Sequence, residues 1–150
     1  MKLIDGAPNE IVLEREFDAP RALVYRAMSE PAIAIKWMGN SCSAMIACDM
    51  DVRVGGTYRH VYQTPDGNTF AFSGVYKEVS VERTVHSERF NDMPGESLVT
   101  STLVENHGKT TLRIVMAFES PAIRDQVLAT GMQTGANESY DNLERMLHTL

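Results

Sequence analysis

Residues 56–79 have the sequence GTYRHVYQTPDGNTFAFSGVYKEV, and this stretch decides the fold class. Two runs rich in aromatic and β-branched residues, at about 56–63 and 69–79, flank the tetrapeptide Pro65-Asp66-Gly67-Asn68. An Asp-Gly pair tolerates the positive φ angles that a tight turn between two strands requires. The stretch therefore predicts an antiparallel β-hairpin.

The same alternation of strand and turn extends to both sides of this hairpin. Turn residues occur at Gly55-Gly56, Met93-Pro94-Gly95 and Asn106-His107-Gly108. Further strands are predicted at about 44–50, 83–91, 97–105 and 109–118, and a separate first strand is predicted at about 11–17. The short connections between successive strands indicate an antiparallel meander.

Helices are predicted before and after the meander. Asp18-Ala19-Pro20 is typical of a helix start, because Asp can cap free amide groups and Pro suits the first helical position. Ser29-Glu30-Pro31 repeats the pattern, so two short helices follow the first strand. Ser120-Pro121 opens a last helical segment with a kink at Thr130-Gly131. Beyond the kink an apolar stripe follows a helix of about five turns, and its members are Met132, Ala136, Tyr140, Leu143, Leu147 and Leu150.

The stripe of the last helix needs an apolar surface to cover it. The concave face of a strongly curved sheet is the only large one that the other elements offer, which predicts an α+β fold. Near its middle the stripe carries Gly135 and Ala136, where a tightly packed helix would have a large side chain. These small residues indicate either a ligand cavity between helix and sheet or merely a close approach of the two.

The composition limits the domain organisation and the partners. The chain has 150 residues, 43% of them hydrophobic, which predicts one domain over residues 1–150 with a core that needs no disulfide or metal. Its formal net charge is −6, which argues against nucleic acid and anionic membranes as partners. Because no signal peptide and no run of about 18 apolar residues is evident, we expect a cytoplasmic protein.

We expect neither a metal site nor a cofactor. Cys42 and Cys48 would close only a very small loop, so we expect ordinary thiols rather than a disulfide. The four histidines are scattered along the chain, without the paired spacing of a zinc site.

Several short segments, taken in order, resemble those of a known family. They are FDAPR at 17–21, KWMG at 36–39, DVRVGG at 51–56, PDG at 65–67, FSGVYKEV at 72–79 and LATGM at 128–132. Together they resemble the START-like (SRPBCC) superfamily, in the branch named for the activator of heat-shock-protein-90 ATPase, which would link the chain to the stress response. The resemblance implies a helix-grip fold, in which a curved seven-stranded antiparallel sheet wraps a long C-terminal helix and two short helices close one end. The superfamily includes lipid and hormone carriers and polyketide cyclases, whereas the co-chaperone domain binds a large chaperone.

The chain also departs from the family pattern. Trp37-Met38 stands where the family usually has two tryptophans, and Gly135-Ala136 where it usually has Gly-Trp. His60 and His86 replace aromatic residues on two strands, and Ser101 replaces a valine. If strand alternation places these residues on the concave face, the cavity is wider and more polar than is usual in the family.

The leading hypothesis is a module that binds a small, largely apolar or amphipathic molecule. Its candidate ligand-binding residues are Trp37, Met38, Tyr58, His60, Tyr62, Phe72, His86, Glu88, Ser101, Met116, Met132, Ala136 and Tyr140. Burial of apolar surface would provide the affinity, while His60, His86, Glu88 or Tyr62 would orient the ligand.

Two other classes of function stay open at this point. A cyclase- or hydrolase-type enzyme would use the same cavity with His86 or His60 as base, but histidines on strands also occur on solvated faces or in internal hydrogen bonds. A protein-interaction module similar to the co-chaperone domain would use the outer surface. A chaperone partner and a homodimer also remain open, and no residue is assigned a catalytic role.

Overall fold

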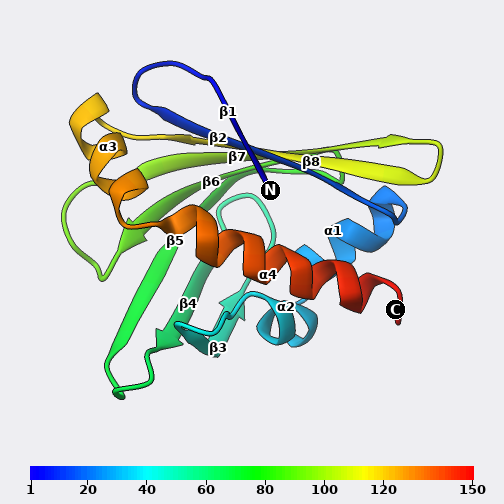
Figure 1. Cartoon of the computed structure of the whole chain (residues 1–150), viewed down its shortest axis with the longest axis horizontal. Helices are drawn as coiled ribbons and strands as arrows, with labels where there is room; N and C mark the ends of the chain where they lie inside the picture. The colour runs from blue at the N-terminus through cyan, green and yellow to red at the C-terminus, as the bar shows by residue number, and fades with distance from the viewer.

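A computed structural model describes residues 1–150 of the chain (Figure 1). Eight antiparallel strands form one sheet in the order β1-β2-β8-β7-β6-β5-β4-β3, and there are four helices. The strands are β1 (Lys2–Ile4), β2 (Glu10–Phe17), β3 (Ala44–Met50), β4 (Thr57–Gln63), β5 (Thr69–Val79), β6 (Arg83–Phe90), β7 (Ser97–Asn106) and β8 (Lys109–Ala117). The helices are α1 (Arg21–Ser29), α2 (Pro31–Trp37), α3 (Pro121–Ala129) and α4 (Met132–Leu147).

The sheet curves around α4, and α1 and α2 lie at one end of the concave face (Figure 1). The helix-grip architecture is thus confirmed, but the predicted number of seven strands is wrong. The additional strand is β1, which pairs with β2 through Lys2–Glu14, Leu3–Leu13 and Ile4–Val12. Three residues are too short for an alternation pattern, so β1 is defined by its pairing with β2 rather than by its own sequence.

The first short helix begins differently from the prediction. Asp18 does not cap α1, because the N-cap position is Pro20, which has no side chain that could bond. The free amide of Arg21 instead donates to the Glu105 carboxylate from the distant β7, at 2.6 Å. A tertiary contact therefore takes the place of the local cap. The second helix does begin at Pro31, as predicted.

The C-terminal helical segment divides at Gly131. Ser120 caps α3 by accepting from the Ile123 amide at 3.2 Å. Gly131 has a φ of +76°, which interrupts the helix and places α4 at an angle to α3 (Figure 1). The predicted stripe continues as far as Leu147, whereas Leu150 lies beyond the helix end and is exposed.

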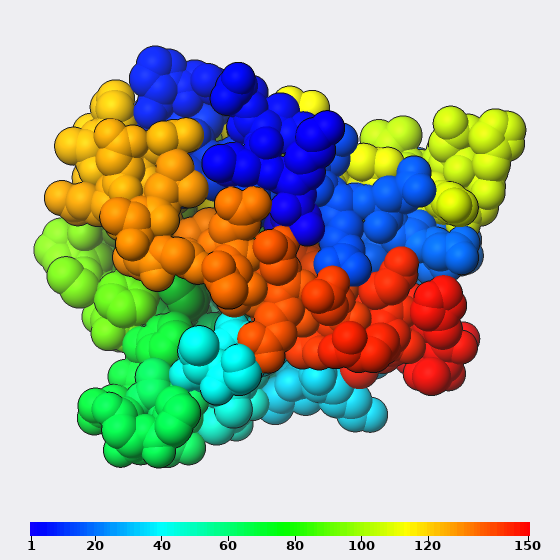
Figure 2. Space-filling model, viewed as in Figure 1, coloured from blue at the N-terminus to red at the C-terminus, as the bar shows by residue number.

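The main core occupies only one half of the space between α4 and the sheet. The buried residues of α4 are Ser139, at the middle of the helix, and Leu143 and Leu147, in its second half. Leu143 and Leu147 belong to a core cluster that includes Phe17, Val24, Ala27, Trp37, Leu103, Leu112 and Ile114. The first seven residues of α4, 132–138, include no buried residue. The helix therefore covers the concave face along its whole length (Figure 2) but is packed firmly only toward its C-terminus.

Two further findings concern cysteines and membrane spans. Cys42 and Cys48 are both free thiols, and Cys42 is exposed.

None of the four helices combines the length and apolar character that a bilayer-spanning helix needs.

Near a β-bulge, strands β5 and β6 approach each other so closely that one position needs a glycine. The pairing shifts register between Tyr76 and Glu78, and the Ser87 hydroxyl accepts from the Val75 amide at 3.0 Å. A Cβ atom at Gly74 would overlap with the Ser87 carbonyl oxygen. Only glycine permits this close approach of the two backbones.

Gly74→Ala is therefore expected to destabilise the protein by about 2 kcal/mol or more, because β5 would have to move away from β6. Urea denaturation gives the free energy of unfolding. Ser73→Ala, at the neighbouring position, serves as the control and should change it by less than about 0.5 kcal/mol. Equal stabilities of the two variants would contradict the assigned bulge geometry.

Candidate functional site

A cavity of about 270 Å³ lies between α4 and the concave face of the sheet. Of the 24 residues that line it, 16 are hydrophobic. Two lining residues are also exposed at the surface. They are Val81, in the turn between β5 and β6, and Arg83, the first residue of β6. The cavity thus reaches the surface near this turn, and the firmly packed half of α4 lies at its other side.

Eleven of the thirteen sequence-predicted residues line this cavity. They are Trp37, Met38, Tyr58, His60, Tyr62, His86, Glu88, Ser101, Met116, Ala136 and Tyr140. Strand alternation accounts for the residues on β4 and β6, and the helical stripe accounts for Ala136 and Tyr140. The structure therefore brings these side chains together around one space, although their contact with a ligand stays a prediction.

Phe72 and Met132 do not line the cavity. Phe72 packs in an aromatic cluster, with its ring centroid 5.4 Å from Phe90 and 6.1 Å from Tyr62. Met132 is the first residue of α4, one turn beyond Ala136, where the cavity ends. Alternation assigns a face of a strand or helix correctly, but it does not show how far along that face a cavity extends.

Other lining residues were not predicted. They are Tyr25, Met28, Ser29, Met50, Val52, Tyr76, Val81, Arg83, Thr84, Val99, Leu103, Ile114 and Ser139. Three of them, Tyr25, Met28 and Ser29, have the i, i+3, i+4 spacing of one helix face, which is a usable sequence signal. The spacing shows that these three residues share one face of α1, but only the tertiary structure shows that this face points into the cavity.

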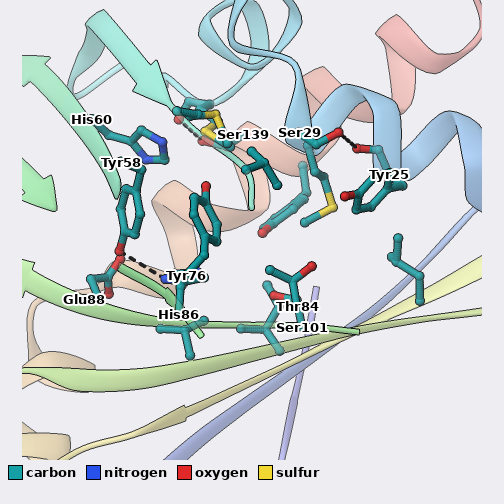
Figure 3. A pocket seen from close by; sticks show the side chains of 18 of the residues that line it. Tyr25, Ser29, Tyr58, His60, Tyr76, Thr84, His86, Glu88, Ser101 and Ser139 are labelled. Atoms are coloured by element: carbon teal, nitrogen blue, oxygen red, sulfur yellow. Dashed lines mark hydrogen bonds between the residues drawn. The ribbon is translucent and has the colours of Figure 1, made fainter. Parts of the chain in front are cut away.

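Tyr58 organises the polar part of the cavity (Figure 3). Its hydroxyl donates to the Ser87 carbonyl oxygen at 2.7 Å, and its ring centroid lies 4.9 Å from that of His60 and 5.0 Å from that of His86. The His86 Nδ1 atom lies 3.1 Å from both the Tyr58 hydroxyl and the Ser87 carbonyl oxygen. Because the carbonyl can only accept, this geometry assigns the proton to Nδ1 and leaves Nε2 as a hydrogen-bond acceptor.

Glu88 is the only acidic residue that lines the cavity. Its carboxyl group takes part in none of the ion pairs or side-chain hydrogen bonds of the protein. Burial raises the pKa of Glu88 to about 7, because the charged form loses its hydration. Burial also raises the pKa values of Tyr58, Tyr62 and Tyr140, and the nearby Glu88 charge adds to this effect.

The two histidines are neutral at pH 7. Burial, together with His86, lowers the pKa of His60 to about 4. Burial also lowers the pKa of His86, against a smaller opposite effect of its bond to Ser87. The Nε2 atom of His60 is buried and has no hydrogen-bond partner. An unsatisfied buried polar atom is unfavourable, so this nitrogen marks a position that a ligand could complete.

Hydrogen bonds tie α4 to the segment that follows α2. The Ser139 hydroxyl donates to the Met38 carbonyl oxygen at 2.9 Å, and the Asn142 amide donates to the Gly39 carbonyl oxygen at 3.2 Å. Trp37 is buried, donates its indole N–H to the Ala27 carbonyl oxygen at 2.9 Å, and packs against Tyr140 with ring centroids 5.4 Å apart. These contacts form a fixed wall of the cavity.

The structure contains no cluster of metal ligands, and the Cys48 thiol is not activated. No three His, Cys, Asp or Glu side chains lie close enough together to hold a metal ion. Burial and the neighbouring Asp49 raise the pKa of Cys48 to about 11, so this thiol stays protonated at neutral pH.

Several solved bacterial structures resemble the chain closely. A protein of Rhodobacter sphaeroides is 29% identical with a TM-score of 0.93, and the match covers 99% of both chains. A protein of Nitrosomonas europaea is 26% identical with a TM-score of 0.87, over 97% of both chains. A protein of Chromobacterium violaceum is 31% identical with a TM-score of 0.78, over 93% of this chain and 97% of the other. No curated relative matches the chain.

A family model agrees with these structural relatives. The model described as Activator of Hsp90 ATPase homolog 1-like protein matches residues 18–148, from the end of β2 to the end of α4. The match includes both short helices, the meander and the helix that closes the cavity, so it covers every element that builds the site. The chain therefore belongs to the family of activator of Hsp90 ATPase homolog 1-like proteins, within the START-like superfamily.

Proposed function

We propose that the protein binds a small, largely apolar ligand in the cavity between α4 and the sheet. One observation carries the proposal: a mainly hydrophobic cavity contains a few convergent polar groups that lack protein partners. Enclosed apolar space with few polar groups is typical of small-molecule sites. A volume of about 270 Å³ equals that of about nine water molecules at ~30 Å³ each, which suits a ligand with a compact bicyclic or tricyclic skeleton.

A second candidate is an enzyme that uses the same cavity. His86 favours it, because Nδ1 is held by Tyr58 and Ser87 while the neutral Nε2 is free to accept a proton. Binding without turnover is the simpler proposal, since no serine, threonine or cysteine side chain forms a hydrogen bond with this base. A third candidate is a protein-binding role on the outer surface, by analogy with the co-chaperone after which the family is named.

Ligand occupancy can be tested with 1-adamantanol, a compact apolar molecule with one hydroxyl group that does not absorb where tryptophan emits. Trp37 is the only tryptophan and lines the cavity, so binding should shift its emission. Calorimetry measures the Kd independently, and native mass spectrometry of the purified protein detects a copurified ligand. Binding by calorimetry with unchanged emission would place the ligand outside this cavity.

Ala136→Trp is expected to fill the space beside Tyr140 and to weaken adamantanol binding tenfold or more, with little loss of stability. Thr134→Trp adds the same side chain at an exposed position of α4 and is the matched control. If the space is already filled, the substitution instead overpacks the core and lowers the free energy of unfolding by about 1–3 kcal/mol. That loss, with binding intact, would contradict a cavity at Ala136.

Glu88→Gln is expected to change the pH dependence of stability. In the wild type the unfolded chain releases the Glu88 proton near pH 4.5, whereas the folded protein keeps it until about pH 7. The stability of the wild type therefore falls between these pH values, and the variant gains about 1–3 kcal/mol relative to it between pH 4.5 and 8.

Urea denaturation at pH 4.5 and pH 8 checks this expectation. Glu16→Gln is the control, since the Glu16 side chain is 62% exposed at the surface and should leave the pH profile almost unchanged. A stability difference between Glu88→Gln and wild type that does not vary with pH would show that Glu88 is not buried in an empty cavity.

A further inference from the structure

Glu88 has no compensating charge inside the cavity. Arg83 is the only cationic residue in the lining, and its guanidinium pairs with Glu78 at 3.0 Å. The Arg83 side chain is also 49% exposed, so it belongs to the entrance rather than to the buried part. Glu88 is half-buried, and a poorly hydrated carboxylate without a counter-charge is unfavourable; a ligand that brings a positive charge would remove this cost.

The hydrogen-bonding groups near Glu88 are complementary to a donor. His86 presents an acceptor, because its Nδ1 proton is held by Tyr58 and Ser87. A primary ammonium group has three donors and could satisfy the Glu88 carboxylate and the His86 Nε2 atom together. A ligand carbonyl could accept from hydroxyl groups of the lining, such as those of Tyr62 and Tyr140, but it would leave an ionised Glu88 and the His86 Nε2 atom without a donor.

Aromatic surfaces also surround this carboxyl group. Its charge acts on Tyr58, Tyr62 and Tyr140, which approach from β4 and from α4. Figure 3 shows Tyr58, His60, His86 and Glu88 gathered at one side of the cavity, away from Tyr25 and Ser29. Aromatic rings around a buried carboxylate attract a cation and leave an anion without any positive partner.

We propose that the ligand is an apolar amine, whose protonated nitrogen pairs with Glu88 and donates to His86 while its hydrocarbon part fills the rest of the cavity. This inference rests on the proposed ligand-binding function and specifies the class of ligand. The Glu88 ion pair gives the selectivity, and apolar burial gives the remaining affinity.

Three compounds with one skeleton test the charge. They are 1-adamantanamine, a cation; 1-adamantanol, a neutral molecule; and adamantane-1-carboxylate, an anion. Calorimetry at pH 7.5 should give an amine Kd at least tenfold lower than that of the alcohol, with the carboxylate weakest. Glu88→Gln should reduce the ratio of amine to alcohol affinity to near one, while Glu16→Gln should preserve the wild-type ratio.

The pH dependence is a second, independent measurement on the wild type. The titratable groups that line the cavity near Glu88 are Tyr58, His60 and Tyr62 on β4, Tyr76 on β5, His86 on β6 and Tyr140 on α4. The one permanently charged group of the lining is Arg83, which pairs with Glu78. Burial lowers the pKa values of these two histidines and raises the pKa values of these four tyrosines. Among these groups, Glu88 is therefore the one that changes charge between pH 6.5 and 8. Amine affinity should rise about threefold to fourfold over this range, whereas alcohol affinity should not rise.

The outcomes separate this inference from the proposed function. If the alcohol binds in the cavity as tightly as the amine, or if Glu88→Gln weakens both alike, the amine inference is wrong and the binding function stands. If none of the three compounds binds and no ligand copurifies, both are overturned. If Glu88→Gln does not fold, the two measurements on the wild type test the amine inference: the ratio of amine to alcohol affinity, and the rise of amine affinity with pH.

Discussion

Burial of Leu143 and Leu147 on the last two turns of α4 is the packing on which the remaining structure depends. These side chains join Phe17 and Leu112 from the sheet and Trp37 from α2 in one core. Hydrogen bonds from Ser139, at the middle of α4, and from Asn142 to the segment after α2 hold this part of the helix in place. A helix held so firmly at one half does not need large side chains in the other half, and the cavity occupies the space that remains.

The position of the cavity determines its electrostatics. Strands β4 and β6 direct His60, His86 and Glu88 into a space enclosed by aromatic rings, where water cannot solvate a charge well. Both histidines are therefore neutral, and the carboxyl group titrates near pH 7. The hydrogen bonds of Tyr58 fix the orientation of His86, so the cavity presents acceptors in a defined geometry rather than mobile polar side chains.

The β-bulge between Tyr76 and Glu78 links the fold to this geometry. It changes the register between β5 and β6, so that Tyr76 lies opposite His86 and both line the cavity. In the same strand, Gly74 lies against the Ser87 carbonyl oxygen, which accepts from the Tyr58 hydroxyl. A local feature of the backbone thus positions the side chains from which we infer the ligand class.

The amino-acid sequence by itself determined the strands of the meander, the two short helices and the stripe of α4, because turn residues and apolar periodicity are local properties. Alternation also identified the face of β4 and β6 that carries His60, His86 and Glu88. The tertiary structure decided what depends on contacts between distant segments. It added β1, replaced the Asp18 cap by Glu105, and ended the cavity before Phe72 and Met132. Periodicity shows which way a side chain points, but only packing shows what it meets there, and burial and charge follow from that contact.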